Sequence, residues 1–235
     1  MNKIISFSLY GNKPNFQVGA VVNTIEAKRI YPDWRCRFYT TDNDTVCKQL
    51  EYLGAEVVRM DDWPDGNMFW RFLAVDDADI CISRDADSVV NEREAGAVRE
   101  WLEDSEYQWH GMHDHRQHRK VSLMGGMWGY RHFGINCPAS LAEKGAYFFD
   151  FRSGKTMRSL IEDWLNQDDG RNRQTTGRGW DQLFLGDAIV SDKAETNTLW
   201  HGGCGWPRNG LCEGRAFPAH DPVRYGSHVG SYVFS

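Results

Sequence analysis

Hydrophobic and polar positions follow two patterns along the first part of the chain. Short runs rich in β-branched and aromatic residues, bounded by Gly, Pro, Asn or Asp, predict strands. Between these runs, apolar residues recur at helical spacing, which predicts helices with one buried face. The predicted strands are Ile4–Tyr10, Arg35–Thr40, Ala55–Met60 and Ile80–Ser83. Strands that alternate with helices in this way are typical of an α/β protein with a parallel sheet.

The first predicted helix carries a stripe of four aliphatic residues. Val18, Val21, Val22 and Ile25 share one helix face, so we expect this face to pack against the sheet. Pro32 ends the helix. Further helices are predicted around residues 46–53 and 68–75, and from Asn91 onward.

After about residue 105 the pattern becomes less regular. The predicted elements there are the strands Gly125–Arg131 and Asn197–His201 and the helices Thr156–Asn166 and Trp180–Ile189. The histidine-rich stretch His110–Lys120 is either a metal site or, as we favour, a polar loop beside a cleft. We find no linker and no internal repeat, and therefore expect one domain over residues 1–235.

Two carboxylates directly follow the fourth predicted strand. Arg84, Asp85, Ala86, Asp87 and Ser88 stand at the carboxyl end of this strand, the edge where parallel sheets bind ligands. Aspartate oxygens suit Mg²⁺ or Mn²⁺, and a cation held by one or two carboxylates keeps positions open for phosphates. The alternative is that this segment only caps a turn. Its position at the strand end leaves both interpretations open.

Composition and charge narrow the possible function classes. The chain has 33 acidic and 27 basic residues, and its net charge of −6 argues against a general polyanion binder. The cysteines form no C-x-x-C pair, and we expect reduced thiols in the cytoplasm, or the host cytoplasm if the protein is viral. No apolar run approaches the length of a membrane span. The sequence after the first strand, Y-G-N-K-P, lacks the G-x-G-x-x-G of a Rossmann dinucleotide site.

Three further stretches follow the D-A-D in a fixed order. They are G-G-M-W-G-Y-R from Gly125, G-W-D-Q-L-F-L from Gly179 and L-W-H-G-G-C-G-W from Leu199. The ordered set resembles metal-dependent glycosyltransferases of the GT-A fold, glycogenin-like in motif order, and a group of small glycosyltransferase-like proteins. The resemblance covers residues 1 to about 205. It implies a Rossmann-like GT-A fold with a mostly parallel sheet, in which residues 1–105 bind the nucleotide and residues 106–235 bind the donor sugar and the acceptor.

The resemblance also implies roles for individual residues. Asp85, Asp87 and His201 would bind Mn²⁺ or Mg²⁺ against the diphosphate of a nucleotide sugar, with His228 as an alternative third ligand. A UDP-sugar is expected rather than a GDP-sugar. The residues expected to bind the donor are Phe7, Ser8, Tyr10, Gly11, Arg71, Arg84, Asp114, Gly125 and Gly126.

The implied reaction is transfer of a hexosyl or pentosyl group to an acceptor hydroxyl, with Asp181 and Gln182 at the reacting carbon. If Asp181 deprotonates the acceptor, the configuration at that carbon inverts. Attack from the face of the leaving group retains it, and the D-Q pair favours retention. Asp181 also has a structural alternative as a helix N-cap. Two other functions stay open, a nucleotidyltransferase and an inactive carbohydrate- or nucleic-acid-binding module.

Two basic loops bear on the nature of the acceptor. Residues 113–120 and 170–179 contain several arginines. If both loops border the cleft, the acceptor is an anion such as a nucleic acid with a hydroxylated base, as in phage DNA, because arginines bind phosphates without reading sequence. The interpretation that we favour is that both are solvated loops of an acidic chain.

Overall fold

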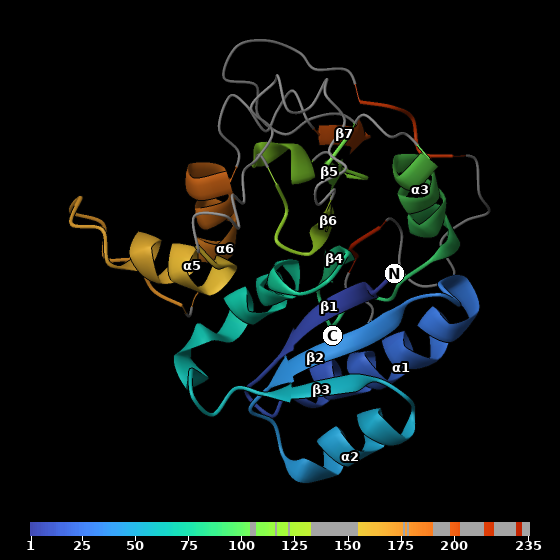
Figure 1. Cartoon of the computed structure of the whole chain (residues 1–235), viewed down its shortest axis with the longest axis horizontal. Helices are drawn as coiled ribbons and strands as arrows, with labels where there is room; N and C mark the ends of the chain where they lie inside the picture. The colour runs from blue at the N-terminus through green and yellow to red at the C-terminus, as the bar shows by residue number, and fades with distance from the viewer. Residues whose placement is uncertain are drawn as a thin grey trace.

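Figure 1 shows the computed structural model of the chain. It describes residues 1–103, 107–115, 117–121, 123–132, 155–175, 177, 179–189, 198–202, 214–218 and 229–231. Within these residues, no helix is both long and apolar enough to cross a membrane. One sheet contains strands from both halves of the sequence.

The described residues form a seven-stranded sheet. Its strands are β1 (Lys3–Leu9), β2 (Arg35–Thr40), β3 (Glu56–Arg59), β4 (Ile80–Arg84), β5 (Trp109–Met112), β6 (Met127–Arg131) and β7 (Thr198–His201), in the spatial order β3-β2-β1-β4-β6-β5-β7. Strands β1 to β4 run parallel to one another, and β5 runs parallel to β7. Strand β6 is antiparallel to both of its neighbours, β4 and β5. The prediction of an α/β protein with a mostly parallel sheet is therefore confirmed.

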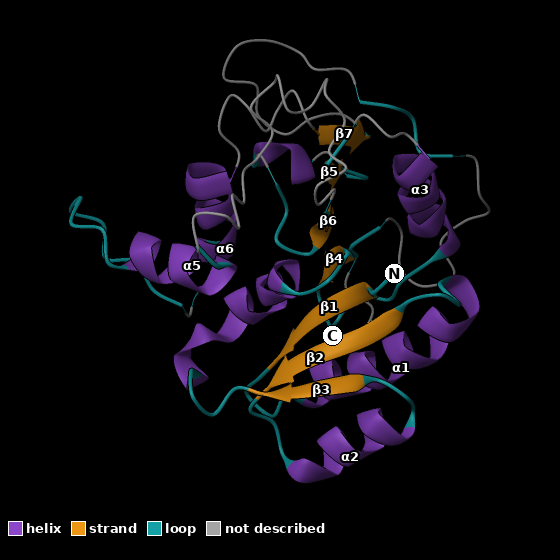
Figure 2. Cartoon of the chain, in the orientation of Figure 1, coloured by secondary structure: helices purple, strands orange, loops and turns teal. Residues whose placement is uncertain are grey.

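Helices cover both faces of this sheet. They are α1 (Pro14–Ile30), α2 (Asp44–Tyr52), α3 (Glu92–Glu103), α5 (Met157–Leu165) and α6 (Trp180–Phe184), with the 3₁₀ segments η1 (Pro64–Asp76) and η2 (His118–Lys120) and the π-helical turn η5 (Leu185–Ile189). Buried residues of α1, α2 and α3 form one core cluster with the sheet, and those of η1, α5 and α6 form another. Figure 2 shows α1 and α2 together beside β2 and β3, with α5 and α6 grouped away from them.

Strand β5 corrects the first three residues of our prediction that His110–Lys120 is a polar loop. His110 is fully buried, and its Nε2 lies 2.9 Å from Nδ1 of His201 on the paired strand β7. Gly111 lies so close to Trp200 that a Cβ there would be 2.3 Å from the indole ring. The sequence did not reveal this strand because histidine and glycine are typical of loops. Here the histidine is buried against a partner, and the glycine makes room for a large ring.

Helix α1 turns a different face to the sheet from the one that its hydrophobic stripe predicts. Val18 and Ile25 are each 49% exposed. The amide of Asn23, which is buried, makes hydrogen bonds of 2.9–3.3 Å to three backbone groups of residues 86–90. Gly19 lets the helix approach this segment so closely that a Cβ there would lie 2.0 Å from a carbonyl oxygen. These contacts set the rotation of α1, and through them the helix holds the segment that carries the second aspartate of the D-A-D.

This rotation predicts that the aliphatic stripe contributes little to stability. We expect Ile25→Gln to change the free energy of unfolding by no more than about 0.5 kcal/mol, because the side chain is half exposed. Ile30→Ala on the same helix should cost about 2–5 kcal/mol, because Ile30 is buried in the core cluster. Urea unfolding of both variants checks this. An Ile25→Gln loss as large as that of Ile30→Ala would mean that the stripe faces the core after all.

Candidate functional site

One pocket lies at the carboxyl ends of β1 and β4, beside the start of β6 and of α6. Its volume is about 530 Å³. Most of the residues predicted to bind the donor, the metal or the reacting carbon line it: Ser8, Tyr10, Arg71, Asp85, Asp87, Gly125, Gly126, Asp181 and Gln182. The fold thus brings together side chains from widely separated parts of the chain, as expected for the edge at which parallel strands end.

The D-A-D forms a turn directly after β4. The backbone N–H of Ser88 donates to the carbonyl oxygen of Asp85 at 3.3 Å, so the turn predicted as the structural alternative does form. Both carboxylates nevertheless line the pocket. The side chain of Asp85 is 34% exposed, and Asp87 is 7% exposed. A turn held from behind by α1 therefore presents two carboxylates to one space.

Gly126 lies against Asp85 because of the register of β4 and β6, and Gly125 lies against Asp181. Arg84, the last residue of β4, pairs with Met127, the first residue of β6, so the residue before β6 lies beside Asp85. A Cβ on Gly126 would lie 2.2 Å from Oδ2 of Asp85. One on Gly125 would lie 1.9 Å from Oδ2 of Asp181. The glycine pair is thus required for the close approach of backbone and carboxylates.

Arg71 connects the two sides of the pocket. Its guanidinium donates to Asp85 through Nη1 and to Oδ2 of Asp181 through Nη2, the second at 2.6 Å. Its backbone N–H donates to Oγ of Ser8 at 3.0 Å, which fixes η1 against the end of β1. The side chain is almost fully buried. One cation therefore bridges a carboxylate at the end of β4 and a carboxylate at the start of α6.

Among the described residues that line the pocket, negative side chains outnumber positive ones. Three carboxylates, Asp85, Asp87 and Asp181, face two cationic side chains, Arg71 and Lys13. Burial raises the pKa of Asp181, Arg71 opposes this, and the charge of Asp85 adds to it. Burial also raises the pKa of Tyr10, an effect that Arg71 opposes and the three carboxylates reinforce. These described side chains favour a cation in the pocket.

The donor set of Asp85 and Asp87 fits a divalent cation that shares its coordination with phosphates. No group of three or more His, Cys, Asp or Glu side chains suited to a metal is found in the described part of the chain. Mg²⁺ is commonly held by one or two carboxylates, with waters and substrate phosphates completing the octahedron. Two carboxylates in an open pocket meet this requirement without a third protein ligand.

The structure places His201, the predicted third ligand, outside the set of residues that line the pocket. Its Nδ1 lies 2.9 Å from Nε2 of His110, and its Nε2 lies 3.2 Å from Oε2 of Glu100. The side chain is fully buried and is not among the residues that line the pocket. Both ring nitrogens are therefore engaged at β5 and α3, away from the aspartates. His228 lies outside the described residues.

Four residues that the sequence assigns to the donor are also not among the pocket residues. Phe7 points to the opposite face of β1 and stacks on Phe38 at a centroid distance of 4.7 Å. Arg84 is fully buried, and its Nη1 donates to the carbonyl oxygen of Gly126 at 2.9 Å. It therefore supports the pocket wall from behind. Side-chain alternation along a strand explains the position of Phe7, because Ser8 faces the pocket and its neighbour cannot.

Asp114 and Gly11 complete the set of four. Asp114 forms an ion pair with Arg93 at 2.8 Å and accepts a hydrogen bond from the backbone of Val229 at 3.0 Å, so it ties α3 to other segments. Gly11, with φ of +82°, begins the turn that leads from β1 to Lys13. Gly11 therefore affects the pocket only by directing the backbone toward Lys13.

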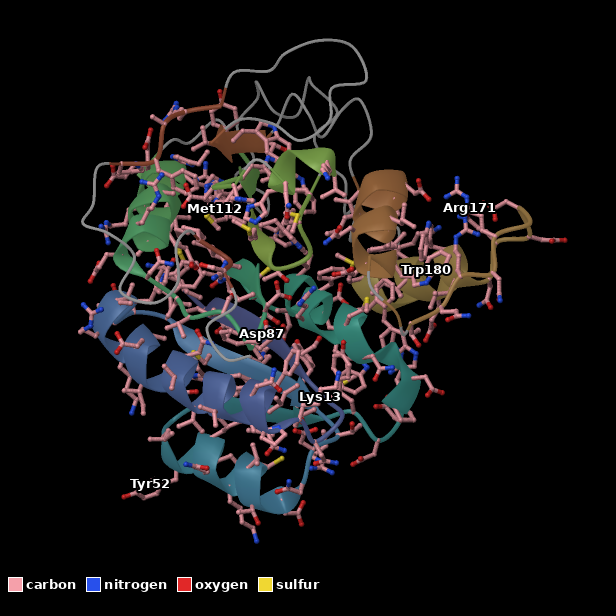
Figure 3. All side chains as sticks on the ribbon, turned by 180° about the vertical axis from the view of Figure 1, so that it is seen from behind. Lys13, Tyr52, Asp87, Met112, Arg171 and Trp180 are labelled. Carbon is pink, nitrogen blue, oxygen red and sulfur yellow. The ribbon has the colours of Figure 1, made fainter. Side chains whose placement is uncertain are left out.

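The two described arginines of the second basic loop, Arg171 and Arg173, each form an ion pair with an aspartate. Arg171 lies 2.5 Å from a carboxylate oxygen of Asp187, and Arg173 forms an ion pair with Asp169. Figure 3 shows Arg171 at the outer edge of the molecule, far from Asp87. The side chains of Arg116, Arg119 and Arg178 lie outside the described residues. This arrangement favours the interpretation of residues 170–179 as a solvated loop, although Gly177 and Gly179 reach the pocket.

Lys13 and Phe16 line the pocket and were not predicted. Lys13 precedes the first turn of α1, and its Nζ lies 5.4 Å from the ring centroid of Phe16. Asn12 holds the loop before it: its backbone N–H donates to Oδ1 of Asp42 at 3.1 Å, and its φ is +50°. The signal in the sequence was Lys13 within the turn cluster G-N-K-P, but this segment matches no phosphate-binding motif.

Comparison with known proteins gives weak similarities. No family model and no curated protein matches the sequence. Solved structures with partial likeness include glucosyl-3-phosphoglycerate synthase from Mycobacterium tuberculosis with Mn²⁺, UDP and phosphoglyceric acid (13% identity, 72% of this chain and 80% of that chain, TM-score 0.42). A mannosyltransferase from Pyrobaculum calidifontis with GDP-Man and Mn²⁺ has 12% identity over 55% of this chain and 44% of that chain, TM-score 0.42. Mannosyl-3-phosphoglycerate synthase from Rubrobacter xylanophilus has 16% identity over 56% and 54%, TM-score 0.41. The chain spans about half the length of the last two, and likeness at this level identifies no family.

Proposed function

We propose that the chain is a glycosyltransferase that uses a nucleotide sugar and a divalent cation. The observation that carries this proposal is the convergence of Asp85, Asp87 and Asp181 with Arg71 in one pocket at the carboxyl edge of the sheet. Carboxylates that line one pocket and outnumber its described cationic side chains favour a ligand that arrives with its own cation. A nucleoside diphosphate linked to a sugar is such a ligand.

Separate groups of residues would bind the cation, the phosphates and the base of the donor. Asp85 and Asp87 would hold Mg²⁺ or Mn²⁺, which supplies Lewis-acid stabilisation of the departing diphosphate. Lys13 and Arg71 line the pocket as donors suited to phosphate oxygens. On the α1 side of the same pocket, Phe16 offers an apolar surface for a base. These placements support the proposal that residues 1–105 bind the nucleotide.

Asp181 and Gln182 would face the sugar. Asp181 is buried, ion-paired with Arg71 and in contact with the backbone of Gly125. A fixed carboxylate beside the reacting carbon stabilises the positive charge that develops as the bond to the diphosphate breaks. We assign this electrostatic role to Asp181 and an orienting hydrogen-bonding role to Gln182, because its uncharged amide both donates and accepts.

The test is ligand-dependent thermal stability. UDP, GDP and CMP, with UDP- and GDP-sugars, are screened with and without Mn²⁺ on the wild type, on Asp87→Asn and on Asp163→Asn. Asp163 is an exposed aspartate on α5 and provides the matched loss of a carboxylate. A ligand at a hundredfold excess over its Kd should stabilise the protein by about 2.7 kcal/mol. We expect a Mn²⁺-dependent shift in the wild type and in Asp163→Asn, and none in Asp87→Asn. If no nucleotide raises the melting temperature with any cation, the proposal is wrong.

A further inference from the structure

Two contacts occupy the carboxylate of Asp85. On one side, Nη1 of Arg71 donates to Oδ1. On the other side, the backbone of Gly126 lies so close that a Cβ there would be 2.2 Å from Oδ2. A cation that binds this carboxylate must therefore share it with an arginine and with a strand end.

Of these two neighbours, only the arginine can give way. Arg84 Nη1 donates to the carbonyl oxygen of Gly126 at 2.9 Å, and Ser83 Oγ donates to that of Gly125 at 2.8 Å, so both ends of the glycine pair are fixed to β4. The guanidinium of Arg71 has a second partner, Asp181, at 2.6 Å. It can leave Asp85 and keep that ion pair.

We propose that Arg71 competes with the divalent cation for Asp85 and thereby couples cation binding to nucleotide binding. The inference rests on the proposed function. In the protein without nucleotide, the guanidinium neutralises Asp85 and repels a second cation, so the cation alone binds weakly. A diphosphate offers the released Nη1 new acceptor oxygens, which makes the exchange favourable.

The coupling is reciprocal by thermodynamic necessity: a nucleotide that raises the affinity for the cation has its own affinity raised by the same factor. Lys13 is the matched comparison, because it also lines the pocket as a cation but forms no ion pair with Asp85 or Asp181. Removal of Lys13 should weaken the nucleotide and leave the affinity for the cation alone nearly unchanged.

The experiment measures Mn²⁺ binding directly, by the loss of the free Mn²⁺ electron paramagnetic resonance signal, with and without UDP or GDP. We expect Arg71→Met to bind Mn²⁺ alone at least about tenfold more tightly than the wild type, and the gain in Mn²⁺ affinity caused by the nucleotide to shrink. Lys13→Met should bind Mn²⁺ alone as the wild type does. An Mn²⁺ affinity of Arg71→Met equal to or below that of the wild type would overturn the inference.

A second variant covers the case in which Arg71→Met does not fold, because that change leaves the buried Asp181 without its ion-pair partner. Arg71→Met/Asp181→Asn removes both charges and should show the same tighter binding of Mn²⁺ alone. The two proposals fail differently. If, in the presence of UDP or GDP, the wild type binds no more Mn²⁺ than Asp87→Asn does, the proposed function fails. If it does bind, but neither Arg71 variant changes Mn²⁺ affinity, only the coupling is wrong.

Discussion

Gly126→Ala is expected to weaken the cation-dependent binding of nucleotides while the protein remains folded. The added Cβ would lie 2.2 Å from Oδ2, 2.5 Å from Cγ and 2.8 Å from the backbone nitrogen of Asp85. Rotation of the Asp85 side chain cannot relieve the last of these contacts, so the end of β4 and the start of β6 must separate. Overpacking of this kind costs about 1–3 kcal/mol. A displaced Asp85 should weaken Mn²⁺-dependent nucleotide binding by more than about tenfold, or 1.4 kcal/mol.

Gly170→Ala is the control for this prediction. Gly170 has a φ of +78°, so alanine is strained there, but no other atom lies within 4 Å of the Cβ position. We expect a loss of stability of about 1 kcal/mol and unchanged binding. Isothermal titration with UDP or GDP and Mn²⁺, together with urea unfolding, separates the two effects. Equal nucleotide affinity in Gly126→Ala and the wild type would show that the close approach of Gly126 to Asp85 has no bearing on binding.

The strands that the sequence predicts well are those whose apolar residues are continuous. β1, β2 and β4 occur within a residue or two of the predicted bounds, because both faces of these strands are covered. The prediction of which face of α1 is buried was wrong, because contacts that form only in the folded chain set the rotation of the helix. Asn23 and Gly19 pack on residues 86–90, and no periodicity in the sequence distinguishes them from surface positions.

The candidate site also has a part that the sequence predicts and a part that it does not. The D-A-D, the glycine pair and the D-Q pair stand out as motifs, and the structure gathers all of them at one pocket. Their relation depends on the antiparallel register of β4 and β6 and on a guanidinium that joins residues 85 and 181. Such contacts link distant positions and leave no local signal. His201 was assigned by motif order alone, and its partners on β5 and α3 become visible only once the sheet is assembled.

Arg84→Met should strongly destabilise the protein. Nη2 of Arg84 lies 3.1 Å from Oε2 of Glu94, and neither side chain is exposed. Removal of one partner of a buried ion pair leaves an uncompensated charge and costs about 3–5 kcal/mol. Asn91 and Glu94 have the spacing of a capping box, and Asn91 does accept from the Glu94 backbone at 3.0 Å. The carboxylate of Glu94 instead faces Arg84, while Tyr31 donates to it at 3.2 Å.

The pH dependence of this loss distinguishes a buried charge from lost packing. In the wild type, burial raises the pKa of Glu94, and Arg84 and Tyr31 oppose the rise. Without Arg84 the pKa in the folded state rises further above the unfolded value of about 4.3. The folded state then binds more protons than the unfolded state between these two values, so stability is regained as the pH falls. The deficit of Arg84→Met relative to the wild type should therefore be largest at pH 7 and smaller at pH 5.

Urea unfolding at both pH values, on the wild type, on Arg84→Met and on Arg84→Met/Glu94→Gln, measures this. The double variant buries no unpaired charge, so it should recover stability at pH 7 relative to Arg84→Met and lose the extra pH dependence. Groups that titrate elsewhere are the same in all three proteins and cancel in the differences. If the deficit is equal at both pH values and Glu94→Gln restores nothing, the loss comes from the hydrogen bond to Gly126 and from packing. In that case the ion pair of Arg84 and Glu94 would not be what stabilises the end of β4.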